Sequence, residues 1–566
     1  MCGIFALLNA DSRLTNEIIN NAFYKAQSRG PELSKLITPC IACNIGFHRL
    51  AINGLNTDSD QPMLNEEVLL VCNGEIYNYK ELYKLFPDDT AKTDSDCEII
   101  IHMYRKYGID YTLNNLDGVF AFVLIDLDKN KMFVARDPYG VRPLYHMQFN
   151  YDTKLKNNIT FNAFASEMKQ MVPMSNKLHE LLATNEKPPV TKQFTPGSYS
   201  SYSLYEGSWH FMKTDRFSTH GFLENSFSNY SNLLQEINER LVTAVKKRVI
   251  GTTDRPVACL LSGGLDSSLV TSIVSRYVPN LETYSIGLKG SEDLKYAKKV
   301  AEFLGTKHTE IIVDEDDFFN AIHEVIYKIE SFDTTTVRAS VGNYLVAKWI
   351  KERSETSPKV IFNGDGSDEV SGGYMYFHAA PNATDFDHDC RRLLNEIHYF
   401  DVLRSDRSIS TNGLEPRTPF LDRSWVQFFL SIPKEIRCHN LHNKCEKYLI
   451  REAFSDGTWL PEEVLFRTKE AFSDGVSSQT KSWFEIITEK VSTIWSQEEA
   501  DALMTAYKYE HMPPETLEQL YYRTIFDKLY PNMATSIPHF WMPNFVDAKD
   551  SSARTLDVYN QHMATS

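Results

Sequence analysis

The sequence predicts two structural units in one chain, a strand-rich first unit and a second unit of the α/β class. In the first ~150 residues, short apolar runs at 68–72, 119–125 and 131–135 are bounded by Gly, Asn, Asp or Pro, which is typical of strands. Farther along, runs such as 257–261 and 360–363 are apolar throughout and are separated by helical segments. Strands of that kind are typical of a parallel sheet that helices cover on both faces.

Composition narrows the class of protein. The 566 residues are 42% hydrophobic and 24% charged, which is ordinary for a globular protein. A net charge of −16 argues against nucleic-acid and anionic-membrane partners. No apolar run approaches the roughly 18 residues of a membrane helix, and the N-terminus lacks the pattern of a secretory signal. Nine cysteines, an odd number, fit a reducing compartment, so we expect a cytoplasmic protein.

The first unit is expected to contain one clear helix, at 15–28, where apolar residues recur on one side at helical spacing. From about residue 150 to 207 the chain becomes polar and proline-containing, and the strand pattern fades. We therefore divide the chain into a first unit over 2–205, a second unit over 206–546 and a polar tail over 547–566.

The second unit reads as an alternation of helices and buried strands. Its expected elements in chain order are helix 230–249, strand 257–261, a helix opened by 262–268, strand 282–287, helix 296–304 and strand 360–363. Beyond about residue 390 the pattern is mostly helical. We therefore expect a parallel sheet with added helices.

The first candidate functional residue is Cys2, which directly follows Met1. If Met1 is removed, Cys2 carries both a thiol and a free α-amino group. Such an amine titrates at about 7.7–8.0 and can act as the base for the thiol. A thiolate is a strong nucleophile toward a carboxamide carbon. Cys2 is therefore the predicted nucleophile, on the condition that Met1 is lost.

Four further residues fit a site of that kind. Asn73 and Gly74 directly follow the predicted strand 68–72, where an Asn side chain and a Gly N–H can form an oxyanion hole. Arg49 and Asp96 supply the opposite charges that bind a zwitterionic amino acid. Cys72 and Cys97 lie in apolar surroundings and are expected to be core residues.

Eight motifs of the first unit together resemble the class II glutamine amidotransferase domain. They are Cys2-Gly-Ile-Phe5, Arg29-Gly-Pro-Glu32, His48-Arg-Leu50, Gln61-Pro62, Asn73-Gly-Glu-Ile-Tyr-Asn78, Ser95-Asp-Cys-Glu98, Phe120-Ala-Phe122 and Arg136-Asp-Pro-Tyr-Gly-Val-Arg-Pro-Leu-Tyr145. The resemblance implies an N-terminal-nucleophile αββα sandwich in which Cys2 attacks the glutamine carboxamide and ammonia leaves. It implies that Asn73 and Gly74 form the oxyanion hole and that the glutamine-binding residues are Arg49, Asn73, Gly74, Glu75 and Asp96.

Two loops of the second unit are suited to phosphate. The first, Ser262-Gly-Gly-Leu-Asp-Ser-Ser268, lies between a buried strand and a helix, where glycines and free helix N–H groups can approach a polyanion. It lacks the Gly-Lys-Ser/Thr of the ordinary P-loop. The second, Asn363-Gly-Asp-Gly-Ser-Asp-Glu369, carries acids that need a cation beside a phosphate, which makes Asp368 a candidate Mg²⁺ ligand.

The loop 262–268 resembles the PP-loop of ATP pyrophosphatases. With Val337–Ser340, Gly372–Tyr374, Glu415–Asp422 and Lys469–Gly475, it makes the second unit similar to the synthetase domain of the asparagine synthetase family. The resemblance implies a doubly wound parallel sheet and Mg²⁺ at Asp266 and Asp368. It implies ATP-binding residues at Leu260, Ser262, Gly263, Gly264, Asp266, Ser267, Ser268, Ile286, Asn363 and Gly364.

Three catalytic residues of the second unit follow from the same resemblance. Asp365 stands where the family has the Glu linked to a β-aspartyl-AMP intermediate. Lys469 and Arg338 are candidates for stabilising charge on the phosphates or on the acyl-phosphate transition state.

The two resemblances cover nearly the whole chain in the order of a glutamine-hydrolysing synthetase. They imply a ligase that makes asparagine from aspartate and glutamine with ATP and Mg²⁺, releasing AMP, pyrophosphate and glutamate. Its partners would be small-molecule substrates, with a homodimer as one expectation for its assembly. Two alternatives stay open: a related amidotransferase or adenylating amide synthetase with a different acceptor acid, and a catalytically impaired regulatory homologue.

Overall fold

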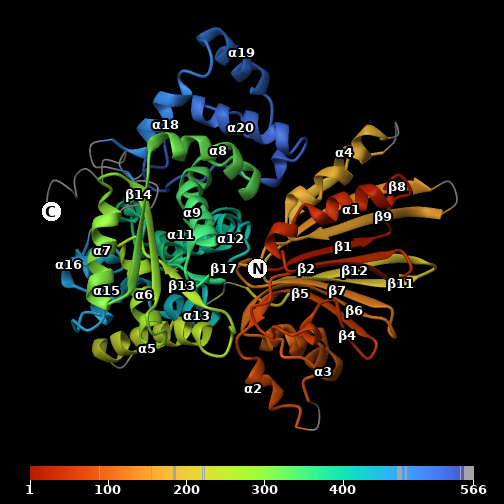
Figure 1. The fold of residues 1–566 in the computed structure, drawn as a ribbon, viewed down its shortest axis with the longest axis horizontal. Helices are drawn as coiled ribbons and strands as arrows, with labels where there is room; N and C mark the ends of the chain where they lie inside the picture. Colours follow the sequence, from red (N-terminus) through yellow and green to blue (C-terminus); the bar gives the residue numbers. More distant parts are fainter. Residues whose placement is uncertain are drawn as a thin grey trace.

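The computed structural model describes residues 1–566 apart from 88–89, 154–155, 183–185, 220, 222, 228, 468–474, 478–480, 549 and 553–566. Figure 1 shows two bodies side by side, one from the N-terminal and one from the C-terminal part of the chain. Within the described residues, no helix is long and apolar enough to cross a membrane. The predicted organisation into a strand-rich unit and an α/β unit is confirmed.

The N-terminal body contains two stacked six-stranded sheets whose strand pairs are antiparallel. The order in the first is β10 (Val190–Gln193), β8 (Tyr145–Thr153), β9 (Lys156–Ala165), β1 (Gly3–Leu8), β3 (Cys43–Arg49) and β2 (Leu33–Cys40). The order in the second is β12 (Ser208–Arg216), β11 (Ser198–Tyr205), β7 (Lys131–Arg136), β6 (Gly118–Asp126), β5 (Val68–Ile76) and β4 (Met63–Asn65).

Helices cover the outer face of each sheet (Figure 1). They are α1 (Asn16–Tyr24) and α4 (Val172–Glu180) on the first sheet, and α2 (Tyr79–Tyr83) and α3 (Ile99–Asn115) on the second. Because side chains alternate along a strand, Phe5 and Leu7 of β1 pack on the helical side, whereas Ile4 and Ala6 pack between the sheets. The expected αββα sandwich is confirmed.

The C-terminal body is built on a five-stranded parallel sheet. Its order is β15 (Lys307–Val313), β14 (Glu282–Leu288), β13 (Val257–Leu260), β16 (Val360–Phe362) and β17 (Glu415–Arg417). The first strand lies in the middle, and the chain adds strands on one side and then on the other. That order makes the sheet doubly wound, with a switch point between β13 and β16, as expected.

Helices cover both faces of this sheet. Cys259 and Phe362 pack with α5 (Tyr230–Val249), α6 (Leu265–Ser275), α7 (Glu292–Leu304) and α13 (Arg423–Ser431). Ala258 and Ile361 pack with α8 (Glu315–Ile329) and α9 (Thr334–Arg353). The other helices are α10 (Ser367–Ser371), α11 (Ala383–Glu396), α12 (Asp401–Ser410), α14 (Lys434–Arg437), α15 (Tyr448–Ala453), α16 (Glu462–Leu465), α18 (Trp483–Val491), α19 (Gln497–Tyr507) and α20 (Leu517–Leu529).

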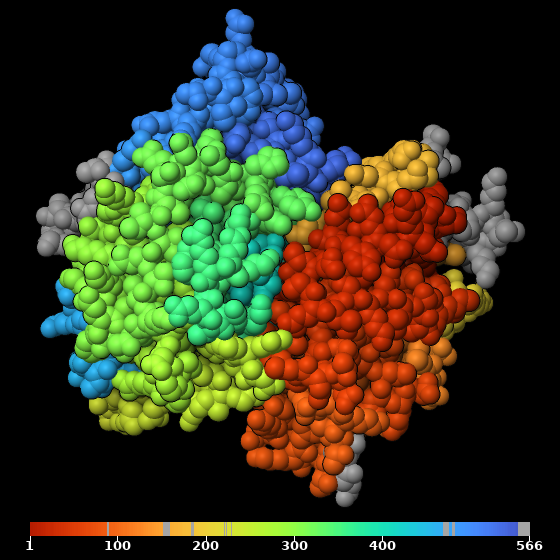
Figure 2. Space-filling view, viewed as in Figure 1, coloured from red at the N-terminus to blue at the C-terminus, as the bar shows by residue number. Residues whose placement is uncertain are grey.

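A network of buried charges joins the two bodies, whose surfaces meet directly in Figure 2. Its members are Arg29, Glu167 and Lys169 of the N-terminal body and Glu330, Asp406 and Arg407 of the C-terminal body. Arg29 Nη1 lies 2.7 Å from Asp406 Oδ1, and Arg407 Nε lies 3.2 Å from Glu330 Oε2. Because three cations face three anions, each buried charge is compensated.

We expect Arg407→Ala to lower the free energy of unfolding by about 3–5 kcal/mol, because Glu330 and Asp406 would then stay buried without their guanidinium partner. Arg240→Ala on α5 is the control, since the Arg240–Glu236 pair is 42% and 40% exposed and should contribute under about 1 kcal/mol. Urea unfolding of both variants measures the difference. Equal shifts would contradict a stabilising role for the network.

Candidate active sites

The first candidate site is a pocket that brings together every residue predicted to bind or attack glutamine. Its lining includes Cys2, Arg49, Asn73, Gly74, Glu75 and Asp96. Cys2 directly precedes β1, and the other residues come from β3, from β5 and from the short turn Asp96–Glu98. Glu415 of β17 also lines the pocket, so the second body supplies part of the wall of the first site.

Cys2 is held by hydrogen bonds on both its thiol and its backbone. Its thiol donates to the Leu50 carbonyl at 3.5 Å, and Arg29 Nε donates to the Cys2 carbonyl at 2.9 Å. Burial raises the pKa of the Cys2 thiol to about 11. The Met1 amino group lies 3.9 Å from Glu415 Oε2, and burial lowers its pKa to about 6. With Met1 present the Cys2 nitrogen is an amide, so the predicted base depends on the loss of Met1.

Asn73 and Gly74 lie inside β5, where they pair with β6. The prediction that they follow the strand was wrong, because the strand continues past its apolar residues. Among the described residues, the buried Asn73 Nδ2 has no hydrogen-bond partner, which makes it a donor ready for an oxygen in the pocket. A Cβ on Gly74 would lie 2.6 Å from the Val119 carbonyl oxygen, so only glycine fits there.

Arg49 orders the loop that borders the pocket. Its guanidinium donates to the Asn56 carbonyl at 3.0 Å and to the Gly54 carbonyl, and it pairs with Asp60. Arg49 therefore lines the pocket while some of its guanidinium N–H groups are already hydrogen-bonded to this loop.

The two acidic residues of the pocket are buried. Asp96 Oδ2 accepts the N–H of Ile76 at 2.5 Å, and burial raises the pKa of Asp96 to about 6. Glu75 lies 3.3 Å from Arg417 Nη2, and burial raises the pKa of Glu75 well above its usual range. A cationic group in the pocket would favour the ionised form of both carboxyls.

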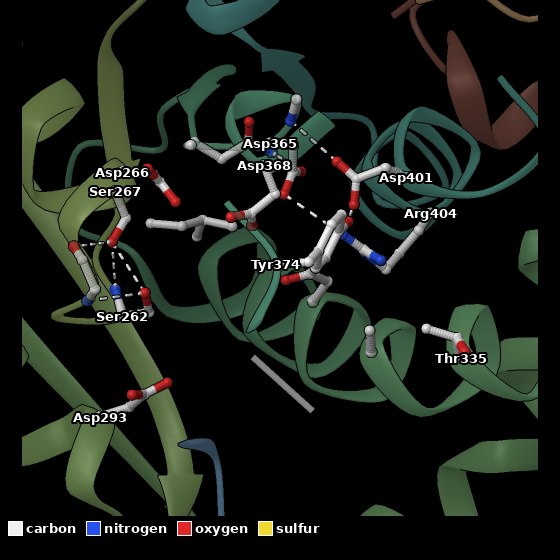
Figure 3. A pocket seen from close by; sticks show the side chains of 17 residues that line it. Ser262, Asp266, Ser267, Asp293, Thr335, Asp365, Asp368, Tyr374, Asp401 and Arg404 are labelled. Carbon is white, nitrogen blue, oxygen red and sulfur yellow. Dashed lines mark hydrogen bonds and ion pairs between the residues drawn. The ribbon is translucent and has the colours of Figure 1, made fainter. Parts of the chain in front are cut away.

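The second candidate site lies at the carboxyl ends of β13 and β16, at the switch point of the parallel sheet, where ligands of such sheets bind. Its predicted lining residues are Leu260, Ser262, Gly264, Asp266, Ser267, Asn363, Gly364, Asp365 and Asp368. Figure 3 shows Asp365 and Asp368 between Ser267 on one side and Arg404 on the other. Both loops of the sequence analysis therefore meet in one pocket.

The serine-rich loop is organised by its own hydroxyl groups. Ser262 and Ser267 are 2.9 Å apart through their hydroxyl oxygens, and Ser267 Oγ accepts the Ser262 N–H at 3.2 Å. The loop leads into α6, whose N-terminal N–H groups favour an anion. A Cβ on Gly364 would lie 2.7 Å from the Ser267 nitrogen, so glycine is needed where the loops meet.

Lys447, which no sequence motif indicated, pairs with two of the aspartates that line this pocket. Its Nζ lies 2.6 Å from both Asp266 and Asp368, and the side chain is 1% exposed. Lys447 has φ +59°, a left-handed conformation that is uncommon for lysine. A Cβ on Gly373 would collide with Lys447 Cε and Asp368 Oδ1, so glycine is what allows this lysine to approach.

Asp401 and Arg404 of α12 form the opposite wall of the pocket. Asn363 Nδ2 donates to Asp365 Oδ2 at 2.7 Å, and Arg404 Nη2 lies 3.8 Å from Asp365 Oδ1. Arg404 also pairs with Asp401. Burial raises the pKa of Asp365. No sequence motif identified the two α12 residues, because helical spacing alone does not distinguish a pocket wall from a core.

Three predicted nucleotide-binding residues are absent from the lining that the described residues form. Gly263 has φ +76°, and a Cβ there would collide with the Ala297 backbone, so Gly263 shapes the turn. Ser268 in α6 and Ile286 in β14 are buried behind the lining. Their contribution to ATP binding stays a prediction.

The structure does not bring Arg338 to the pocket, contrary to the expectation for a phosphate-binding residue. Its guanidinium is bidentate to Glu518, at 2.8 and 2.6 Å, and to Asp550, at 2.8 Å for both contacts. Two carboxylates therefore hold Arg338 where it ties α9 to α20 and to the segment that follows it. Lys469 lies outside the described residues.

Helix α12 connects the two candidate sites. Asp401 and Arg404 face the second pocket, and Asp406, about one turn farther, binds Arg29. Arg29 in turn donates to the backbone of Cys2. One short helix thus contacts both pockets, directly at one and through a single arginine at the other.

These features define a protein class: an N-terminal-nucleophile amidotransferase body joined to a synthetase body whose loop suits a nucleotide. Residues 1–216 match the family described as Glutamine amidotransferase domain, and residues 236–391 and 379–545 match the family described as Asparagine synthase. "Asparagine synthetase [glutamine-hydrolyzing]" of Gallus gallus is 39% identical over 585 residues, covering 99% of each chain. The Homo sapiens protein of that name is 39% identical over 583 residues, with the same coverage. The chain belongs to the asparagine synthase family.

Proposed function

We propose that the chain makes asparagine from aspartate, glutamine and ATP through a β-aspartyl-AMP intermediate, releasing glutamate, AMP and pyrophosphate. The observation that carries the proposal is the pair of pockets linked by α12, one around Cys2 and one around the loop 262–268. The names of the full-length relatives support the same reaction.

The first half-reaction belongs to the Cys2 pocket of the mature chain without Met1. The Cys2 amine takes the thiol proton, and the sulfur attacks the glutamine carboxamide carbon. Asn73 Nδ2 and the Gly74 N–H stabilise the oxyanion, and ammonia leaves with the proton. Water then hydrolyses the thioester to glutamate. Arg49 would bind the glutamine carboxylate, and Glu75 and Asp96 its ammonium group.

The second half-reaction belongs to the pocket at the switch point. The loop 262–268 and the N-terminus of α6 would hold the ATP phosphates while the aspartate side-chain carboxylate attacks the α-phosphorus and pyrophosphate leaves. Ammonia then attacks the acyl carbonyl and AMP leaves. Lys447 pairs with both Asp266 and Asp368, and we assign it to compensating the charge of these carboxylates beside the phosphates. We assign Asp365 to forming and using the intermediate and keep Lys469 as a proposed phosphate contact.

Asp266 and Asp368 are a donor set that fits Mg²⁺. Within the described residues, no group of three or more His, Cys, Asp or Glu is placed to hold a metal. Mg²⁺ commonly uses one or two carboxylates and completes its shell with water and substrate phosphates. Bound there, Mg²⁺ would neutralise the charge of the pyrophosphate leaving group.

Pyrophosphate release tests the acceptor. We expect release from ATP to require aspartate, with AMP formed in equal amount, because the carboxylate is the attacking group. Glutamate and other acids in place of aspartate are the controls. Pyrophosphate release at the same rate without aspartate would refute the synthetase assignment. Release that requires another acid in place of aspartate would identify the chain as a related amide synthetase.

The pH dependence of glutamine binding tests Asp96. Burial raises the pKa of Asp96 to about 6, and only its ionised form attracts an ammonium group. As the pH falls through about 6, we expect the KM for glutamine to rise toward about tenfold per pH unit, and to stay flat above about 7. Asp96→Asn should have a high KM with no inflection near 6. A wild-type KM constant down to about pH 5 would contradict this role.

The assembly and location of the chain are further proposals. We propose a homodimer, which sedimentation equilibrium of the purified chain tests directly, and a reducing, cytoplasmic location, which the nine free cysteines support. A chain that sediments as a monomer at every concentration would overturn the homodimer. A fluorescent fusion of the chain found outside the cytoplasm would overturn the proposed location.

A further inference from the structure

Two buried thiols besides Cys2 line the glutamine pocket. Cys72 in β5 and Cys97 in the turn Asp96–Glu98 are 1% and 3% exposed. Contact with Cys72 is the largest cause of the raised pKa of the Cys97 thiol. The Cys97 thiol also donates to the Gly74 carbonyl at 3.6 Å. The sequence indicated two separate core residues, whereas the fold places them together as a dithiol against the Asn73–Gly74 segment.

We propose that Cys72 and Cys97 form a redox modification site, which hydrogen peroxide entering the glutamine pocket converts into a disulfide that stops glutamine use. The loss of glutamine use rests on the proposed function, whereas formation of the disulfide does not. Both cysteines are free in the structure, which is therefore the reduced form.

The surroundings favour closure between these two sulfurs. Gln61 fixes the backbone of Cys72 from both sides, since its Oε1 accepts the Cys72 N–H at 2.6 Å and its Nε2 donates to the Cys72 carbonyl at 3.2 Å. Contact with Cys72 and burial raise the pKa of the Cys97 thiol well above its usual range. We assign the first attack on the oxidant to Cys72 and the closing attack to Cys97.

The reaction balances with one peroxide per dithiol. The Cys72 sulfur attacks one peroxide oxygen, the O–O bond breaks, and the thiol proton leaves with the other oxygen as water, which gives a sulfenic acid. The Cys97 sulfur then attacks the Cys72 sulfur and the S–O bond breaks. The hydroxyl leaves with the Cys97 proton as a second water. Two thiols are oxidised by two electrons, and the peroxide is reduced.

A disulfide would change the first pocket and spare the second. The bond requires the sulfurs to approach to about 2.05 Å, which draws the turn that carries Asp96 toward the strand that carries Asn73 and Gly74. Those residues are the proposed ammonium ligand and oxyanion donors. The pocket at the switch point is formed by other loops. Glutamine-dependent synthesis should therefore fall, while ammonia-dependent synthesis continues.

Cys40 and Cys43 provide an internal comparison. They face each other across the β2–β3 hairpin, and contact with Cys43 lowers the pKa of the Cys40 thiol. Neither lines the glutamine pocket that the described residues form. If this pair oxidises too, its disulfide should leave the ratio of glutamine-dependent to ammonia-dependent synthesis unchanged.

Peptide mapping tests the bond itself. Trypsin separates the two sulfurs, with Cys72 on 50–80 and Cys97 on 93–105, while Cys2 and the pair Cys40 and Cys43 fall on other peptides. After treatment of the full chain with hydrogen peroxide, we expect a cross-linked 50–80/93–105 species that dithiothreitol removes. Absence of that species, with the two thiols still alkylatable after denaturation, would overturn the proposal.

Activity tests the consequence. In the wild-type chain, peroxide should lower glutamine-dependent synthesis at least about tenfold relative to ammonia-dependent synthesis, with recovery in dithiothreitol. The glutamine-dependent rate of Cys97→Ser, compared with its own untreated rate, should not fall after peroxide treatment. Cys40→Ser should lose glutamine-dependent synthesis as the wild-type chain does. Equal loss in Cys97→Ser with an oxidised Cys2 peptide would assign the effect to Cys2 and refute the proposal. A wild-type chain that never uses glutamine would refute the proposed function, while the cross-link would still decide the dithiol.

Discussion

Replacement of Cys2 by alanine should abolish glutamine-dependent asparagine formation and preserve the reaction with ammonia. The thiol is the only group proposed to attack the carboxamide, so we expect at least a ~10³-fold loss of glutamate release. The pocket at the switch point does not include Cys2, so ammonia-dependent pyrophosphate release should stay within about twofold of wild type. Parallel assays with glutamine and with ammonium chloride measure both rates.

Cys40→Ala is the matched control for that experiment, since Cys40 lies on the same sheet but outside the pocket lining of the described residues. It should use glutamine at the wild-type rate. Intact mass of the active wild-type chain should show that Met1 is absent, because the proposed base is the amine of Cys2. Full glutamine use by Cys2→Ala, or by a chain that retains Met1, would refute the assigned nucleophile.

Replacement of Lys447 by methionine should impair aspartate-dependent pyrophosphate release and preserve glutamine hydrolysis, which is the opposite of the effect expected for Cys2→Ala. The Lys447 ammonium group lies 2.6 Å from Asp266 and from Asp368, and without it these carboxylates would repel each other and the ATP phosphates. We expect a loss of at least ~10²-fold in aspartate-dependent pyrophosphate release, with either nitrogen source. Hydrolysis of glutamine to glutamate should persist, because the Cys2 pocket does not contain Lys447.

Persistent glutamine hydrolysis also shows that the Lys447→Met chain has folded. Lys444→Met is the control, since Lys444 lies in the same segment but is 51% exposed and pairs with Glu452. It should leave both reactions unchanged. If Lys447→Met releases pyrophosphate at the wild-type rate, Lys447 is only a structural partner of the two aspartates.

The fold was largely predictable because its signals are local. Short apolar runs bounded by turn residues indicated the strands of the first unit, and continuous apolar runs separated by helical segments indicated the parallel sheet of the second. Helix 230–249 was located to the residue in α5. The second unit's boundary was harder to locate. The predicted division after residue 205 falls in the turn between β11 and β12, and β12 stays paired in the same sheet through Arg216, since an exposed edge strand has a weak apolar pattern.

Site residues that belong to contiguous motifs could be predicted from the sequence. Site residues that come from segments distant in the sequence could not. Asn363 and Asp365 follow a buried strand, so their place at a sheet edge follows from the sequence. Arg404 lines the pocket and Lys447 pairs with two of its aspartates, and both come from distant segments that carry no motif. For Arg338, no local pattern could indicate that Glu518 and Asp550, about 200 residues away, would claim its guanidinium.

The buried charges between the bodies have a consequence for hybrids of related chains. The N-terminal body contributes two cations and one anion to that cluster, and the C-terminal body contributes one cation and two anions. Each half alone therefore carries one charge that only the other half cancels. Chimeras that combine halves of two relatives should fold only when all six charged residues of the network are kept as one set. A charge reversal on one side that prevents folding should be compensated by the reciprocal reversal on the other side.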